Sequence, residues 1–248
     1  MNKFNIKKFL KCNLNKLLVI LIYVIMFYGI ANLLGIILKD FATDLNKQII
    51  SSVVINVFIY GVLLTSCLIL LKSEIKTDFK ILNKTDALSV FYICLIGIVA
   101  AYVASIVGNL MSQALGGLGD SQNQQGIETI LFSKYGIIIG FVVIFIGPAV
   151  EEFVFRKSIH EILRSIKCPV WLMLVISSVL FGFIHVLEGG DFVEVFPYVL
   201  MGFVLGGIEI FSKNIYPCII VHMFLNALST VMILYLHFLE QSGIVAGA

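Results

Sequence analysis

The sequence predicts an all-α protein, a polytopic bundle of transmembrane helices with about seven (seven to eight) spans. Of its 248 residues, 60% are hydrophobic and only 13% are charged. A soluble globular domain carries about 45–50% apolar and 25% charged residues. The mean hydropathy is +1.04, and the apolar residues gather in runs of about 20, the length that crosses a bilayer core as a helix. These observations together place the chain in the membrane class.

The apolar runs give seven expected spans, and the whole chain, 1–248, is expected to form a single integral-membrane domain. The N-terminus begins like a signal peptide, but its apolar run exceeds the 7–15 residues of a signal core, so a retained first span is expected. The longest polar segment, 116–135, is expected to be a loop, and the fifth span is expected to be short or re-entrant, ending at Gly189-Gly190. The expected spans are 17–38, 49–71, 87–112, 136–155, 170–187, 192–211 and 215–239.

Lysine and arginine concentrate in alternate connections. Residues before 17 and the segments 72–86 and 156–169 each carry four or five, whereas 39–48 carries two and 116–135 carries one. The positive-inside rule therefore predicts a cytoplasmic N-terminus and an outside C-terminus in the cell membrane. The lysine-, asparagine- and isoleucine-rich usage favours a bacterial source. The net charge of +2 is too small to indicate nucleic acid, so the lipid bilayer is the expected partner.

Five cysteines are scattered without C-x-x-C spacing. Their odd number and apolar surroundings favour buried small side chains over disulfides or a zinc site. Gly202 and Gly206, four apart in the sixth span, predict close helix packing. The cysteines are Cys12, Cys67, Cys94, Cys168 and Cys218.

The first cluster of polar groups at membrane depth is Glu151, Glu152 and Arg156, after a long uncharged run. Ionisable side chains there cost about 2.5–3.5 kcal/mol on insertion scales, so they indicate function by default. Glu152 and Arg156 are four apart and share a helix face, which predicts an ion pair. Glu151 lies over Phe155 in a more apolar sector and is left unpaired, suited to general acid–base chemistry. The alternative is a helix end with charges that reach the interface.

Two further clusters follow, Phe181 with His185 and His222 with Asn226. Each pair is four residues apart and shares a helix face. An imidazole and an amide at this spacing can direct two donors at one atom. The alternatives are a hydrogen-bonded core histidine and hydrogen bonds between helices.

The three clusters are expected to meet in the cytoplasmic half of the membrane. Glu151 and His185 are equally far along the chain from the turn at Cys168, so an antiparallel helix pair brings them level. His222 enters from the same side. This arrangement requires the fourth helix to continue past Arg156 into the cytosol.

Such a set suits hydrolysis inside the membrane. Glu151 and His185 can hold and deprotonate a water molecule, and His222 and Asn226 can donate to an oxyanion. Two histidines and a glutamate are also an acceptable zinc set, and composition and spacing leave these two possibilities open. A thiol nucleophile at Cys218, four residues before His222, is disfavoured.

The chain resembles the CPBP family of intramembrane proteases, which contains the type II CAAX prenyl endopeptidases and the bacterial Abi proteins. The family patterns E-E-x-x-x-R, F-x-x-x-H and H-x-x-x-N all match in order, at Glu151-Glu152-Phe153-Val154-Phe155-Arg156, Phe181-Gly182-Phe183-Ile184-His185 and His222-Met223-Phe224-Leu225-Asn226. The resemblance covers about 130–240, taken as the catalytic core, with 1–129 as accessory helices.

The resemblance implies hydrolysis of a peptide bond within the membrane. Glu151 with His185 would activate water, His222 and Asn226 would stabilise the oxyanion, and Glu152 and Arg156 would support them. It implies no obligatory metal, although a divalent metal such as zinc stays open. The implied substrate is a membrane-associated peptide or protein, in bacteriocin self-immunity or in maturation of secreted peptides, rather than a prenylated tail.

Two other functions are compatible with the sequence. The motifs can serve as a packing network in a non-catalytic immunity or partner protein, or as the proton relay of a small transporter. Outside the motifs, His160 and His237 are expected at the surface or interface, and Glu209 is expected to extend toward the side of Lys213.

Overall fold

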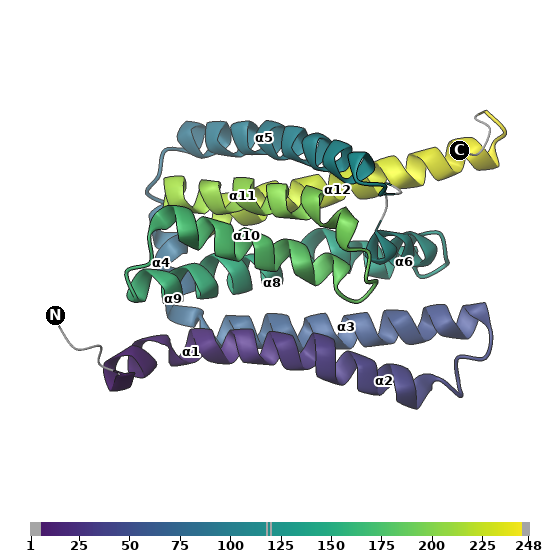
Figure 1. Cartoon of the computed structure of the whole chain (residues 1–248), viewed down its shortest axis with the longest axis horizontal. Helices are drawn as coiled ribbons and strands as arrows, with labels where there is room; N and C mark the ends of the chain where they lie inside the picture. The colour runs from purple at the N-terminus through teal and green to yellow at the C-terminus, as the bar shows by residue number, and fades with distance from the viewer. Residues whose placement is uncertain (1–5, 118, 120, 245–248) are drawn as a thin grey trace.

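The polytopic helical bundle predicted from composition is confirmed. The computed structural model of the protein describes residues 6–117, 119 and 121–244, and every regular element in them is a helix (Figure 1). Six of these helices are long and apolar enough to cross a membrane, and a seventh, Val170–Val186, is shorter. Lys3, one of the N-terminal lysines used for orientation, lies outside the described residues.

Several spans are composites of α- and π-helical segments. The first joins α1 (Ile6–Val24), η1 (Ile25–Ile30) and α2 (Ala31–Leu38). The fourth, Gly136–Ser165, carries the first motif and joins α7 (Gly136–Phe141), η2 (Val142–Ile146), α8 (Gly147–Glu152), η3 (Phe153–Ile159) and α9 (His160–Ser165). The other elements are α3 (Leu45–Leu70), α4 (Lys72–Leu82), α5 (Ala87–Ala114), α6 (Gln122–Leu131), α10 (Val170–Val186), η4 (Phe192–Glu194), α11 (Val195–Ser212) and α12 (Ile215–Gln241).

The expectation of a loop over 116–135 is wrong, because α6 occupies half of it. The hydroxyl of Ser121 accepts a hydrogen bond from the backbone N–H of Gln124 (3.2 Å), which satisfies a free donor of the first turn. Ile130 and Leu131 at the other end of α6 are buried. A capped start and an apolar end stabilise a short helix whose composition alone resembles a loop.

The fifth span is short, as expected. Helix α10 has 17 residues, and the chain turns at once through Gly190, whose backbone is left-handed (φ 71°). Glycine adopts this conformation without the strain that a side chain introduces. The turn brings η4 and α11 back along α10.

The fourth span is the centre of the bundle. In Figure 1, α1, α2 and α3 form one side, α5 forms the opposite side, and the fourth span lies between them with α10, α11 and α12. Over half (56%) of its most apolar window is buried, against 17–28% in the other long spans. The helix ends at Ser165 and so continues past Arg156, as predicted. Its high burial means that the charged motif is surrounded by protein.

An ionic cluster closes one end of the bundle. The Nζ of Lys16 lies 3.1 Å from Glu74 and 3.1 Å from Glu161, and the Nζ of Lys157 lies 2.8 Å from Asp78 and 2.8 Å from Glu161. These pairs join α1, α4 and the fourth span. In Figure 1 the start of α1, α4 and α9 lie at this end, and α6 and the α2–α3 connection lie at the other.

The close packing predicted at Gly202 and Gly206 is confirmed. A Cβ built on Gly202 would lie 3.0 Å from the Cα of Ser178, and one on Gly206 would lie 2.6 Å from a methyl of Leu174. Helices α10 and α11 therefore approach closely where glycine leaves room.

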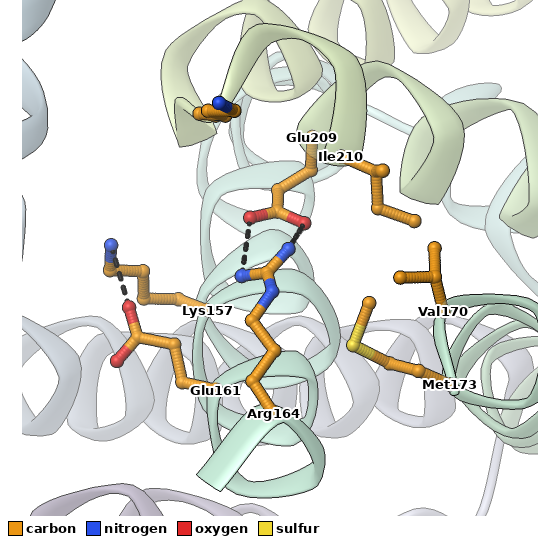
Figure 2. A pocket seen from close by; sticks show the side chains of 8 residues that line it. Lys157, Glu161, Arg164, Val170, Met173, Glu209 and Ile210 are labelled. Carbon is orange, nitrogen blue, oxygen red and sulfur yellow. Dashed lines mark hydrogen bonds and ion pairs between the residues drawn. The ribbon is translucent and has the colours of Figure 1, made fainter. Parts of the chain in front are cut away.

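The surface position predicted for His160 is wrong. Its side chain is fully buried, with Nδ1 2.8 Å from Glu209 and Nε2 2.7 Å from the hydroxyl of Ser177. Glu209 also pairs with Arg164 (2.9 Å) instead of extending toward Lys213. Glu209 and Arg164 both line a cavity of about 370 Å³ (Figure 2). The sequence missed this network because its members come from three helices.

The burial predicted for the five cysteines is only partly confirmed. Cys67, Cys94 and Cys218 are buried, whereas Cys168 is half-buried and Cys12 is exposed. Cys12 lies on the first turns of a helix that extends beyond the predicted span.

We expect Gly108→Ala to destabilise the protein. A methyl there would overlap the backbone of Phe196 and Pro197, where α5 contacts α11, and forced overpacking costs about 1–3 kcal/mol. Gly61→Ala on α3 is the control, because nothing lies within 4 Å of its position. Thermal unfolding in detergent measures the difference, and equal melting temperatures for the two variants would contradict the packing.

We expect His160→Ala to lower the melting temperature more than His237→Ala. The first change removes two buried hydrogen bonds and leaves Glu209 and Ser177 without that partner. Each buried polar group that loses a hydrogen bond lowers the free energy of unfolding by about 1–3 kcal/mol. His237 is half-exposed and stacks on Phe132 with ring centroids 3.8 Å apart. A larger loss at His237 would show that the buried network contributes little.

Candidate active site

The structure brings all three predicted clusters together. Glu151 and Glu152 come from α8, Arg156 from η3, His185 from the last turn of α10, and His222 from the first half of α12. Their side chains meet near the middle of the bundle. The fourth span holds the centre, and α10 and α12 contact it from two sides.

Glu151 faces two imidazoles. Its Oε2 lies 4.0 Å from Nε2 of His185 and 3.7 Å from Nε2 of His222. Tyr60 on α3 lines the same cavity as this carboxylate. The Glu151 side chain is 9% exposed. Of the two motif glutamates, it is the one without an arginine partner, as the spacing predicts.

Glu152 is the anchor of a fully buried network. Its Oε1 accepts from Nη1 of Arg156 (3.0 Å) and lies 2.9 Å from Nδ1 of His222. Arg156 also donates to the carbonyl of Gly202 (3.2 Å), and its guanidinium lies 4.3 Å from the ring centroid of Phe181. The ion pair predicted from the four-residue spacing is confirmed, and it reaches a third helix through His222.

His185 is oriented by its own helix. Its Nδ1 lies 2.9 Å from the carbonyl oxygen of Phe181, one turn earlier. That carbonyl can only accept, so Nδ1 carries the proton and Nε2 presents a lone pair toward Glu151. The ring of Tyr198 stacks on the imidazole with centroids 4.4 Å apart and an interplanar angle of 17°. Both contacts limit rotation of the ring.

Asn226 is engaged differently from His222. Its side-chain N–H donates to the carbonyl of Val143 (2.9 Å), so one of its two N–H groups is used inside the protein and the second remains for a ligand. The reason lies in η2, where Gly147 donates to Val142 five residues earlier. The next donor in that register would be Pro148, which has no N–H. Asn226 supplies the hydrogen bond that the proline cannot.

Two π-helical segments flank the carboxylates. Segment η2 ends just before α8, and η3 begins directly after Glu152. Each π-helical turn inserts an extra residue and rotates the following side chains. In η3 the hydroxyl of Ser158 donates to the carbonyl of Phe153 (2.9 Å), which satisfies an acceptor in the widened turn.

A cavity of about 900 Å³ adjoins the site and is lined by Glu151, His185, His222 and Asn226. Tyr60 also lines it, and the sequence analysis missed this residue. A signal was available, because polar residues recur every four positions along the second span up to Tyr60.

Among the described residues, no group of three or more histidine, cysteine, aspartate or glutamate side chains is arranged to hold a metal ion. Nδ1 of each site histidine is already engaged, with Glu152 or with the Phe181 carbonyl. Nε2 of both rings faces Glu151, and a metal-binding histidine commonly holds its other ring nitrogen in such a hydrogen bond, so the zinc set that the residue types allow stays a prediction.

Comparison with known proteins supports a membrane-protease class. Residues 133–228, which contain all three motifs, match the family model described as type II CAAX prenyl endopeptidase Rce1-like. The chain is 32% identical over 176 residues to an uncharacterized protein of Mycoplasma capricolum, covering 66% of this chain and 49% of the relative. No solved structure matches significantly.

Two relatives carry functional names. The chain is 29% identical to the putative membrane peptidase YdiL of Bacillus subtilis, over 58% of this chain and 57% of the relative. It is 33% identical to the membrane-embedded CAAX protease MroQ of Staphylococcus aureus, over 49% of each. The chain thus spans about half the length of the curated relatives it matches.

The fold and these matches define the class: this is a polytopic membrane protein whose residues 133–228 match the Rce1-like family model. The family resemblance predicted from the three motifs is confirmed.

We expect Glu152→Gln to destabilise the protein strongly. It leaves Arg156 as a buried charge without its carboxylate, at about 3–5 kcal/mol, which corresponds to a melting temperature lower by on the order of 10 °C. Thermal unfolding in detergent is the measurement.

The double variant Glu152→Leu with Arg156→Met tests the cause of that loss. Removing both charges together avoids an unpaired ion, so part of the stability should return. An unchanged melting temperature in Glu152→Gln would contradict the importance of the pair.

Proposed function

We propose that the protein is an intramembrane endopeptidase that hydrolyses a peptide bond in a membrane-associated peptide or protein. The observation that carries this proposal is the Glu151 carboxylate, which faces Nε2 of both His185 and His222 beside a large cavity. A carboxylate and imidazoles in such contact can activate water and exchange protons with a reacting group.

In the proposed first step, Glu151 and His185 hold the attacking water. Their facing atoms are 4.0 Å apart, a gap that one water can bridge with two hydrogen bonds of about 2.8 Å. Nε2 of His185 accepts a hydrogen bond from one O–H of the water, which keeps that hydrogen, and Glu151 takes the other proton as the oxygen attacks the carbonyl carbon.

The tetrahedral intermediate then carries a negative oxygen. In the proposal, Nε2–H of His222 donates to the oxyanion, while Nδ1 remains 2.9 Å from Oε1 of Glu152. The second N–H of the Asn226 amide is the other donor. Such prearranged donors contribute about 10²–10³ in rate. Glu151 returns its proton to the leaving amine as the C–N bond breaks.

Glu152 and Arg156 act as positioning residues. The Glu152 carboxylate, held by Arg156, fixes the ring of His222. This mechanism uses only groups of the chain and includes no obligatory metal.

The proposed setting is the cell membrane of a bacterium, with the N-terminus in the cytoplasm. The lysine-rich ends of α1, α4 and α9 lie on one side of the bundle, as the positive-inside rule requires of the cytoplasmic face (Figure 1). Processing of bacteriocins or other secreted peptides, or self-immunity, is the role we propose.

We expect Glu151→Gln to reduce peptide cleavage by at least about 10²–10³, because an amide cannot accept the water proton. Purified protein in detergent is incubated with a pool of quenched fluorescent peptides, and products are read by fluorescence and mass spectrometry. Glu240→Gln, an exposed site at the end of α12, is the matched control.

Cleavage that persists in Glu151→Gln would reject the mechanism. A wild-type protein that cleaves nothing but drives pH-dependent uptake into vesicles would instead be a transporter, and one inactive in both assays would be a non-catalytic partner. A parallel incubation with a chelator tests the metal, and full activity is expected there.

A further inference from the structure

One face of α3 is polar along the cavity. Gln48, Ser52, Asn56 and Tyr60 all line the cavity and follow one another at intervals of four residues. Residues four apart share a helix face, and twelve residues cover about 18 Å. Polar groups within a span are costly unless they face protein or a filled cavity. The stripe ends at Tyr60, which lines the same cavity as Glu151.

The other walls combine amide side chains with apolar ones such as Ile127, Val142 and Met201. Seven asparagine or glutamine side chains line the cavity, among them Asn32 of α2, and Gln122 and Gln124 of α6, whereas only Lys39, Glu151 and Glu188 carry a formal charge. An amide both donates and accepts hydrogen bonds, as a peptide backbone does. Walls that mix amides with apolar side chains suit a peptide, whose backbone pairs with the amides and whose apolar side chains contact the rest.

The lining amides keep capacity for a ligand. Asn56 donates one N–H to the carbonyl of Ser52 (2.9 Å), and Asn32 donates one to Tyr28 (3.0 Å). Each of these side chains has a second N–H and a carbonyl oxygen. An extended chain advances about 3.4 Å per residue, so the stripe matches about five residues.

The cavity opens at one end of the bundle. Its lining includes Lys39 and Leu45 at the α2–α3 connection, Gln122 at the start of α6, and Gly189 after α10. These segments lie opposite α4 and α9 in Figure 1. No described residue of α4 or α9 lines the cavity. The mouth is therefore at the end away from the ionic cluster.

We infer that this cavity binds a peptide segment in extended form, which enters from the non-cytoplasmic side of the membrane. The sidedness follows from the positive-inside rule, which assigns the lysine-rich end to the cytoplasm. The substrate class is an exported or membrane-anchored peptide whose chain is exposed outside. The binding part rests on the proposed proteolysis, whereas the sidedness does not.

Labelling with a membrane-impermeant maleimide tests the sidedness without any activity. In the Cys12→Ser, Cys168→Ser background the remaining cysteines are buried. Gln48→Cys at the mouth should react in intact cells, and Lys80→Cys, exposed on α4, should react only after permeabilisation. The wild-type chain provides a second control, because exposed Cys12 should also need permeabilisation. The opposite pattern would overturn the entry side.

Peptide binding is tested at Asn56. Asn56→Leu should raise KM for the quenched fluorescent peptides about 10-fold or more, with a smaller change in kcat, because position 56 is one turn from Tyr60 and does not contact the reacting atoms. Thr65→Val on the same helix is the control, since Thr65 is exposed and does not line the cavity. An unchanged KM would overturn the peptide site.

The two tests separate the possible failures. If Glu151→Gln retains cleavage but Gln48→Cys reacts from outside, the mechanism fails and the open outer cavity stands. If Asn56→Leu keeps KM and phospholipid stays bound to the delipidated wild-type protein but not to this variant, the cavity holds lipid and the peptide site is rejected.

Discussion

The buried ion pair between Glu152 and Arg156 is the interaction on which the rest of the site depends. Two charges in a membrane-embedded core are tolerated only when each is neutralised and hydrogen-bonded. The pair has these partners in the carbonyl of Gly202, the ring of Phe181 and the imidazole of His222, while Oε2 of Glu152 and Nε of Arg156 have none among the described residues. The fourth span, α11, α10 and α12 are thereby held at one point, and Glu151 is directed to the open side.

The irregular backbone of the fourth span also depends on contacts within the bundle. A proline and two π-helical segments interrupt its ladder of hydrogen bonds, and in a membrane each freed group needs another partner. Asn226 and Ser158 supply partners from the side chains. The site helix is thus stable only within the assembled bundle, which explains why a motif residue such as Asn226 can serve packing and chemistry together.

The two ends of the molecule are chemically different. Lys16, Lys157 and three acids bind α1, α4 and the fourth span together at one end. At the other end, a cavity whose walls include several amide side chains lies between the helices. The ion pairs hold one end together, and the cavity at the other end leads to Glu151.

Sequence alone determined the helical class, the spans to within a few residues at most ends, the shortened fifth span and the Glu152–Arg156 pair. Hydropathy and four-residue spacing are local properties, so they can be recognised in the sequence without knowledge of the fold. Tertiary structure decided what depends on contacts between distant segments: the burial of His160 against Glu209 and Ser177, the bond from Asn226 to Val143, and the position of Tyr60. These residues are ordinary in their own helices, and only the packing of neighbouring helices gives each its partner.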